Sequence, residues 1–196
     1  MRHLVTSGVE RGLLGPRETG RIWTRHVLNC AVIGELVPAE ASVLDIGSGA
    51  GLPGIALAIA RPDLSITLVE PLERRTIWLQ EVVEDLGIGV RVVRARAEEL
   101  PGRERAQVVM ARAVAALPKL AGWGLPLVQD GGTLLAIKGR SAQDELAAAA
   151  PGLRRAGARQ MDVVECGVGV LGTPTTVVRV VVGPDRAVRG SGRRSR

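Results

Sequence analysis

Residues 42–54 have the residue types and the spacing best suited to holding a small ligand. The apolar run 42–46 contains Asp45, and four glycines follow within the next eight residues: Gly47, Gly49, Gly51 and Gly54. Glycine adopts positive φ without a Cβ clash and lets a ligand come close to the backbone. A helix-like apolar segment follows, and the first N–H groups of a helix are free to face a ligand. The pattern predicts a strand, a ligand-binding turn and a helix.

This turn fits two classes of cofactor. Residues 49–54 match G-x-G-x-x-G, and Glu70 follows about twenty residues later, as in the fingerprint of dinucleotide-binding proteins. Asp45 extends the pattern to D-x-G-S-G-x-G, which resembles the first motif of Rossmann-like methyltransferases that use S-adenosylmethionine (SAM). A carboxylate at this strand end, outside the core, suits the ammonium group of a methionine moiety and would repel a pyrophosphate. We therefore expect SAM rather than NAD, with contacts at Asp45, Gly49, Gly51 and Glu70. Glu70 alone does not separate the two cofactors, because both carry a ribose.

Apolar runs alternate with helix-like segments, which predicts an α/β fold with helices on both faces of a mostly parallel sheet. The expected helices span residues 17–37, 55–60, 74–86, 115–128 and 143–155. The apolar face of the first helix should consist of Ile22, Trp23, Val27, Cys30 and Ile33. The expected strands span residues 42–46, 65–69, 90–93, 107–110, 133–137, 160–165 and 175–182. The last two flank a connection with glycine and proline, so we expect an antiparallel pair at the sheet edge.

Polar side chains stand at or just past the ends of the first five expected strands. They are Asp45, Glu70, Glu98, Arg112 and Lys138. In an open α/β sheet the ligand cleft lies at the carboxyl ends of the strands. We therefore expect these side chains to meet in one cleft.

Length and charge predict one domain with a basic tail. With 196 residues, of which 46% are hydrophobic, the chain can bury a single sheet-centred core. The net charge is +6, and residues 186–196 contain five arginines and no acid. We expect a domain over residues 1–185, with residues 1–40 as a helical N-terminal extension. Residues 186–196 should be a disordered tail that contacts RNA phosphates or only aids solubility.

Other features narrow the class of protein. No apolar run reaches membrane-spanning length and no signal peptide is visible, so we expect a cytoplasmic protein. Cys30 and Cys166 lack metal-ligand spacing, so we expect two reduced thiols and no metal site. The sequence has no Phe and no Tyr. Base stacking on a side chain would therefore need a histidine, an arginine or one of the tryptophans Trp23, Trp78 and Trp123.

Taken with these positions, the sequence resembles the RsmG (GidB) family of 16S rRNA guanine-N7 methyltransferases. The matching segments are residues 25–29, 44–54, 81–83, 96–98, 111–113 and 138–139. The resemblance implies a Rossmann-like class I SAM-dependent methyltransferase fold with a mostly parallel seven-stranded sheet. It implies SAM contacts at Gly47, Leu52, Ala97, Glu98 and Arg112. It also implies methylation of guanine 527, in the 530 loop of 16S rRNA, on free rRNA, the small ribosomal subunit or an assembly intermediate. We expect a monomer.

The N7 atom of guanine is a neutral lone pair with no proton to lose. Methyl transfer to it needs positioning behind the methyl group and no general base. In this positioning sense we assign Arg112 and Lys138 as catalytic residues, Arg112 holding the methionine carboxylate, guanine O6 or a phosphate. Arg25, His26 and Lys138 are the expected contacts to RNA. Two alternatives remain, an NAD-dependent oxidoreductase and a non-catalytic RNA-binding module, and titration with SAM and with NAD would test the first.

Overall fold

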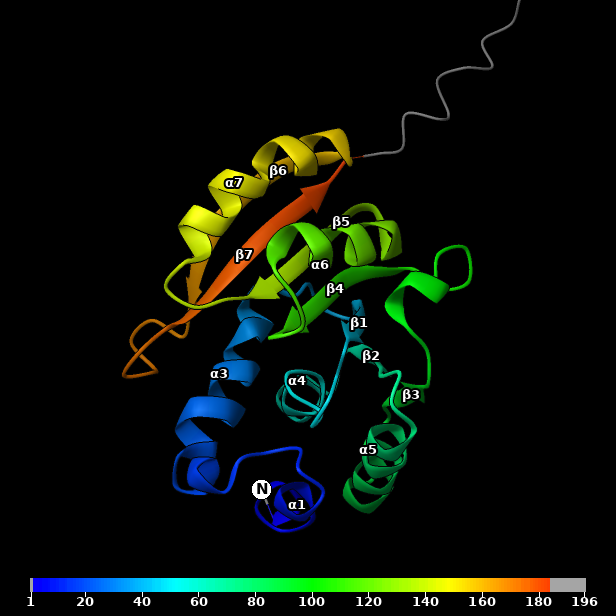
Figure 1. Cartoon of the computed structure of the whole chain (residues 1–196), viewed down its shortest axis with the longest axis vertical. Helices are drawn as coiled ribbons and strands as arrows, with labels where there is room; N and C mark the ends of the chain where they lie inside the picture. The colour runs from blue at the N-terminus through cyan, green and yellow to red at the C-terminus, as the bar shows by residue number, and fades with distance from the viewer. Residues whose placement is uncertain (1, 184–196) are drawn as a thin grey trace, which may run out of the picture.

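Seven strands form one sheet at the centre of the protein (Figure 1). The computed structural model describes residues 2–183, so the predicted basic tail, residues 186–196, lies outside the described part. The strands are β1 (Ser42–Ile46), β2 (Ser65–Val69), β3 (Arg91–Val93), β4 (Ala106–Arg112), β5 (Val128–Ile137), β6 (Ala158–Cys166) and β7 (Thr175–Val182). Their order across the sheet is β3-β2-β1-β4-β5-β7-β6. The first five run parallel, and β7 lies antiparallel between β5 and the edge strand β6. The predicted fold class and edge pair are confirmed.

Helices cover both faces of this sheet (Figure 1). One face carries α6 (Leu117–Gly124), the 3-10 helix η5 (Leu125–Leu127) and α7 (Ala142–Arg155). The other carries the N-terminal helical segments, α4 (Gly54–Ala60) and α5 (Glu73–Leu86). Along β1, Val43 enters one core and Leu44 the other, because successive side chains of a strand point to opposite faces. No helix within residues 2–183 is long and apolar enough to cross a bilayer.

The N-terminal extension is helical, but its winding changes along the chain. After α1 (Arg2–Val5) and α2 (Ser7–Glu10) come η1 (Pro16–Arg21, 3-10), η2 (Ile22–Val27, π), α3 (Leu28–Ala31) and η3 (Val32–Leu36, 3-10). Ile22, Cys30 and Ile33 are buried as predicted, whereas Trp23 is 51% exposed. Its predicted place on the apolar face is wrong, because that prediction assumed about 3.6 residues per turn throughout.

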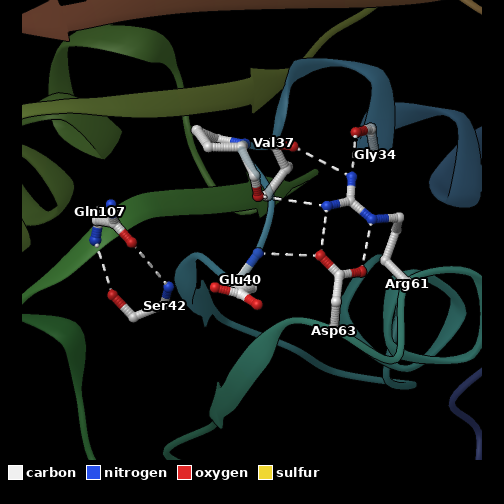
Figure 2. A network of polar contacts seen from close by, with 8 residues as sticks. Gly34, Val37, Glu40, Ser42, Arg61, Asp63 and Gln107 are labelled. Carbon is white, nitrogen blue, oxygen red and sulfur yellow. Dashed lines mark hydrogen bonds and ion pairs between the residues drawn. The ribbon is translucent and has the colours of Figure 1, made fainter.

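Arg61, just past α4, attaches the end of this N-terminal segment to the connection between α4 and β2 (Figure 2). Its Nη1 donates to the carbonyl oxygens of Gly34 and Val37, at 2.9 and 3.1 Å. Asp63 accepts two hydrogen bonds from the same guanidinium, at 2.7 and 2.6 Å, and one from the N–H of Glu40 at 3.0 Å. The guanidinium holds the pKa of Asp63 well below its usual range. Arg61 thus satisfies carbonyl groups that a helix end leaves free.

Candidate active site

A cavity of about 790 Å³ opens at the carboxyl ends of β1, β2 and β4, and we call it the turn cavity. Five predicted cofactor contacts line it together: Gly47, Gly49, Leu52, Glu70 and Arg112. His26, predicted as an RNA contact, lines it as well. The sheet therefore brings these residues into one cleft, where the topology places a ligand site.

The four glycines of the turn have different roles. Gly47 and Gly49 line the cavity with φ of 72° and 53°, and a Cβ on Gly49 would meet only the Gly47 carbonyl oxygen, at 3.8 Å. A ligand can therefore approach the backbone at Gly49. A Cβ on Gly51 would overlap Ile55, and one on Gly54 would overlap Leu68. Gly51 and Gly54 are needed for packing, and the cavity wall does not include Gly51.

Asp45 lies inside the protein and is 0% exposed. Its Oδ2 accepts a hydrogen bond from the N–H of Gly54 at 3.0 Å, and its Oδ1 has no partner among the described residues. The expectation that this carboxylate lies outside the core is wrong, because the first turn of α4 covers the end of β1. Burial raises the pKa of Asp45 to about 7. Asp45 therefore links the end of β1 to the start of α4. Any effect of Asp45 on cofactor binding would be indirect, through the shape of the turn.

We expect the free energy of unfolding of Asp45→Asn to rise relative to that of the wild type as pH rises from 4 to 8. The folded protein binds the Asp45 proton more tightly than the unfolded chain, so the wild type loses stability as pH rises through this window. Asparagine does not titrate, and its amide oxygen can still accept from Gly54. Urea unfolding at several pH values measures this difference in the free energy of unfolding. It should change by about 2–4 kcal/mol between pH 4 and pH 8. Parallel stability curves would show that Asp45 is ionised in the folded state with an ordinary pKa.

Glu70 follows β2 and supports the turn from the other side. The side chain is 2% exposed, and its Oε2 accepts from the N–H of Gly49 at 2.9 Å. Its Oε1 accepts from the N–H of Leu72 at 3.1 Å. Each carboxylate oxygen has a further lone pair, so Glu70 can hold the turn and still accept from a ligand hydroxyl.

Ala97 and Glu98 lie in a smaller cavity beside the first. They belong to η4 (Ala97–Glu99), and the cavity, of about 120 Å³, has a mostly apolar wall that includes Ile46 and Trp123. Gly47 lines both cavities. The predicted SAM contacts are thus divided between two adjoining cavities, except Asp45 and Gly51, which line neither.

Arg112, at the end of β4, faces the N-terminal segment. Its Nη2 lies 2.7 Å from Nδ1 of His26, and its Nη1 donates to the Cys30 sulfur at 2.9 Å. Because a guanidinium only donates, Nδ1 must accept and carry no proton. Nε2 then carries the proton and donates to Glu18 at 2.7 Å, which holds the pKa of Glu18 below its usual value. Burial raises the pKa of Cys30 to about 11, so its thiol stays protonated.

This chain of contacts predicts that Glu18 acts on Arg112 through His26. In Glu18→Ala, Nε2 loses its acceptor, so Arg112 should loosen, and the methyl transfer that the sequence resemblance implies should fall on the order of tenfold. Glu18→Gln should retain most activity, because its amide oxygen can accept the same proton. Ring ¹⁵N spectra should show only the Nε2–H tautomer of His26 in wild type and Glu18→Gln, with His3 as an internal reference. Mixed tautomers in the wild type would contradict the assignment.

Lys138, at the end of β5, is held by its surroundings. Its Nζ donates to the carbonyl oxygen of Ala115 at 2.9 Å and pairs with Glu145 at 2.8 Å. It does not reach the turn cavity. It lines a second cavity of about 540 Å³, together with Arg25, His26 and Arg112. We call this second space the basic cavity.

The two cavities share a wall made of His26, Arg112 and Ala113. The turn cavity and the basic cavity therefore meet at Arg112. Residues 1–170 match a family model described as GidB, rRNA small subunit methyltransferase G. The chain belongs to this GidB family.

Named relatives agree with this membership over nearly the whole chain. The protein is 57% identical to the ribosomal RNA small subunit methyltransferase G of Renibacterium salmoninarum, covering 93% of this chain and 86% of the relative. It is 56% identical to the protein of the same name in Rhodococcus jostii, and the match covers 96% of this chain and 84% of the relative. A GidB protein is a methyltransferase, so the NAD-dependent alternative is not supported.

Solved structures of other methyltransferases share the fold. A methyltransferase of Pyrococcus furiosus superposes with a TM-score of 0.62 at 15% identity, covering 78% of this chain and 80% of that chain. The SAM-dependent methyltransferase SibL superposes with a TM-score of 0.64 at 19% identity, and the match covers 84% of this chain and 57% of that chain. This GidB-family chain therefore has the class I SAM-dependent methyltransferase fold.

Sequence reasoning missed the part that Glu18 and Cys30 play beside Arg112. The sequence predicts Cys30 as a reduced thiol on the apolar face of a helix and gives no role to Glu18. Arg112 lies 82 residues from Cys30 and 86 from His26. No local pattern marks these contacts, although the segment 25–29 pointed to their neighbourhood. Within residues 2–183, no group of three or more His, Cys, Asp or Glu side chains could hold a metal ion.

Proposed function

We propose that this GidB-family protein binds SAM in the turn cavity and methylates N7 of a guanine presented from the basic cavity. Membership of the family makes the chain a SAM-dependent rRNA methyltransferase. The observation that carries the finer proposal is the shared wall at Arg112, because transfer requires donor and acceptor to meet at one point.

The residues of the turn cavity suit SAM. Gly49 leaves open backbone in a left-handed conformation, and Glu70 offers carboxylate lone pairs to ribose hydroxyls. The small apolar cavity, with Ala97 and Glu98 at its wall, would take the adenine. When bound, SAM supplies a methyl group on a positively charged sulfur. Asp45 and Gly51 would contribute indirectly, by setting the shape of the turn.

The described residues at the shared wall suit an acceptor that has no proton to lose. Both ring nitrogens of His26 are engaged in hydrogen bonds. In the turn cavity, the two oxygens of Glu70 each accept a backbone N–H. Arg112 remains a donor at any ordinary pH. It would orient guanine through O6, or hold a phosphate or the methionine carboxylate, and leave N7 free.

The proposed target is guanine 527 of 16S rRNA, as the family resemblance implies. We propose that the protein acts as a cytoplasmic monomer, with Arg25, His26 and Lys138 near the RNA. His26 would contribute by holding Arg112, and Lys138 by holding the loop at Ala115. Both roles are positional.

Methylation with labelled SAM tests this proposal on naked small-subunit rRNA and on assembled small subunits. We expect one N7-methylguanine, located by chain cleavage at that base. Binding of SAM without its consumption would point to a non-catalytic RNA-binding module. Transfer to an exocyclic amine or a hydroxyl would overturn the N7 assignment, and so would saturable NAD binding without SAM binding.

A further inference from the structure

A fourth cavity, of about 600 Å³, continues the basic cavity away from the turn. The two have four lining residues in common: Arg25, Asn29, Arg140 and Thr173. We call the two together the basic groove. One wall comes from η1, η2 and α3, and the other from the connection between β6 and β7 with Arg140 after β5. Figure 1 shows α3 beside this β6–β7 connection.

The charge of this groove has one sign. The described residues that line it include five cations and no acid: Arg21, Arg25, Arg112, Lys138 and Arg140. Three of these contact neighbouring protein groups, since Lys138 pairs with Glu145, Arg25 lies 3.9 Å from Glu18, and Arg112 holds His26. Arg21 and Arg140 are exposed, and neither forms a salt bridge with a described residue. Two guanidinium groups are therefore available to a polyanion at the outer end of the groove.

The lining also indicates what kind of polyanion fits. Asn29, Thr173 and Thr176 offer amide and hydroxyl groups, whereas no tryptophan lines the groove. Binding would therefore depend mainly on phosphates and sugar hydroxyls. A groove that leads to half-buried side chains at the reaction point, His26 and Arg112, admits a single strand. A duplex, in contrast, presents its phosphates on the outside of a wide rod.

We propose that the basic groove binds the single-stranded RNA segment adjoining the target guanine, with Arg21 and Arg140 on its phosphates. This inference deepens the proposed function, on which it rests, by giving the RNA a path from the reaction point at Arg112. The target nucleotide occupies the inner part of the groove, and the flanking backbone leaves between α3 and the β6–β7 connection.

The salt dependence of RNA binding tests this path. Binding of a labelled single-stranded RNA containing one guanine is measured by anisotropy from 50 to 300 mM salt. Removing two phosphate contacts in R21Q/R140Q should reduce the slope of log affinity against log salt by about 1.4, since each contact to a single strand accounts for about 0.7. R21K/R140K should keep the wild-type slope, because the charges remain.

R154Q/R155Q is the matched control, because it removes two arginines from the far end of α7, outside the groove. This control should keep the wild-type slope, and SAM affinity by calorimetry should be unchanged in R21Q/R140Q. An unaltered slope in R21Q/R140Q would overturn the path, and so would an equal loss in R154Q/R155Q. Equal competition by an RNA duplex of the same length would overturn the single-strand assignment. Wild-type methylation of rRNA is measured separately, so its failure would count against the proposed function alone.

Discussion

We expect Arg112→Ala to lower the single-turnover rate of methyl transfer to rRNA about a hundredfold. The substitution removes the donors to His26 and to the Cys30 sulfur from the wall between the two cavities. Donor and acceptor would then no longer be held at one point. Arg112→Lys should recover only part of the rate, because a single ammonium cannot replace a planar, two-pronged donor. Thermal unfolding of both variants shows whether the fold is retained.

The pH dependence of the same step separates positioning from proton transfer. Guanine N7 has no proton to lose, so the single-turnover rate should be nearly flat through neutral pH in wild type and in Arg112→Lys. A rate that rises tenfold per pH unit up to a clear pKa would require a general base. The N7 mechanism would then have to be abandoned.

The second large effect is expected at Gly54, and it concerns stability. A Cβ in Gly54→Ala would lie 2.7 Å from Oδ2 of Asp45 and would also overlap Leu68. Both neighbours are buried, so the strand end and the helix start must move apart. We expect the free energy of unfolding to fall by about 2–4 kcal/mol. SAM affinity should fall as well, because the N–H of Gly54 donates a hydrogen bond to Asp45, which helps to set the shape of the turn.

Gly122→Ala is the matched control for this substitution. Gly122 lies on the exposed side of α6, and a Cβ there would meet nothing within 4 Å. Alanine favours a helix more than glycine does, so the free energy of unfolding of this variant should rise by up to about 1 kcal/mol. Urea unfolding and calorimetry with SAM measure both variants. A Gly54→Ala protein as stable as the wild type would show that the turn relaxes around a side chain.

Much of the fold could be predicted from the sequence because the signals were local. The bounds of β1 and β2 agree with the prediction, since each is a short apolar run closed by a turn. The helix that ends at Leu86 stops where Gly87 takes φ of 60°, as glycine after a helical pattern predicts. β5 begins at Val128 and not at residue 133, because two glycines that look like a break lie inside the strand.

The sequence by itself determined part of the site. Of the five polar side chains expected in one cleft, Glu70 and Arg112 line the turn cavity, whereas Asp45, Glu98 and Lys138 lie elsewhere. Parallel strands end at one edge of their sheet. Gly47, Gly49, Glu70 and Arg112 meet there for that reason. Only the tertiary structure decided what each residue does. Asp45 is covered by the helix that follows the turn, and Arg112 finds its partners in a segment more than 80 residues away. Burial and long-range hydrogen bonds depend on how separate elements pack, and no spacing along the chain records that packing.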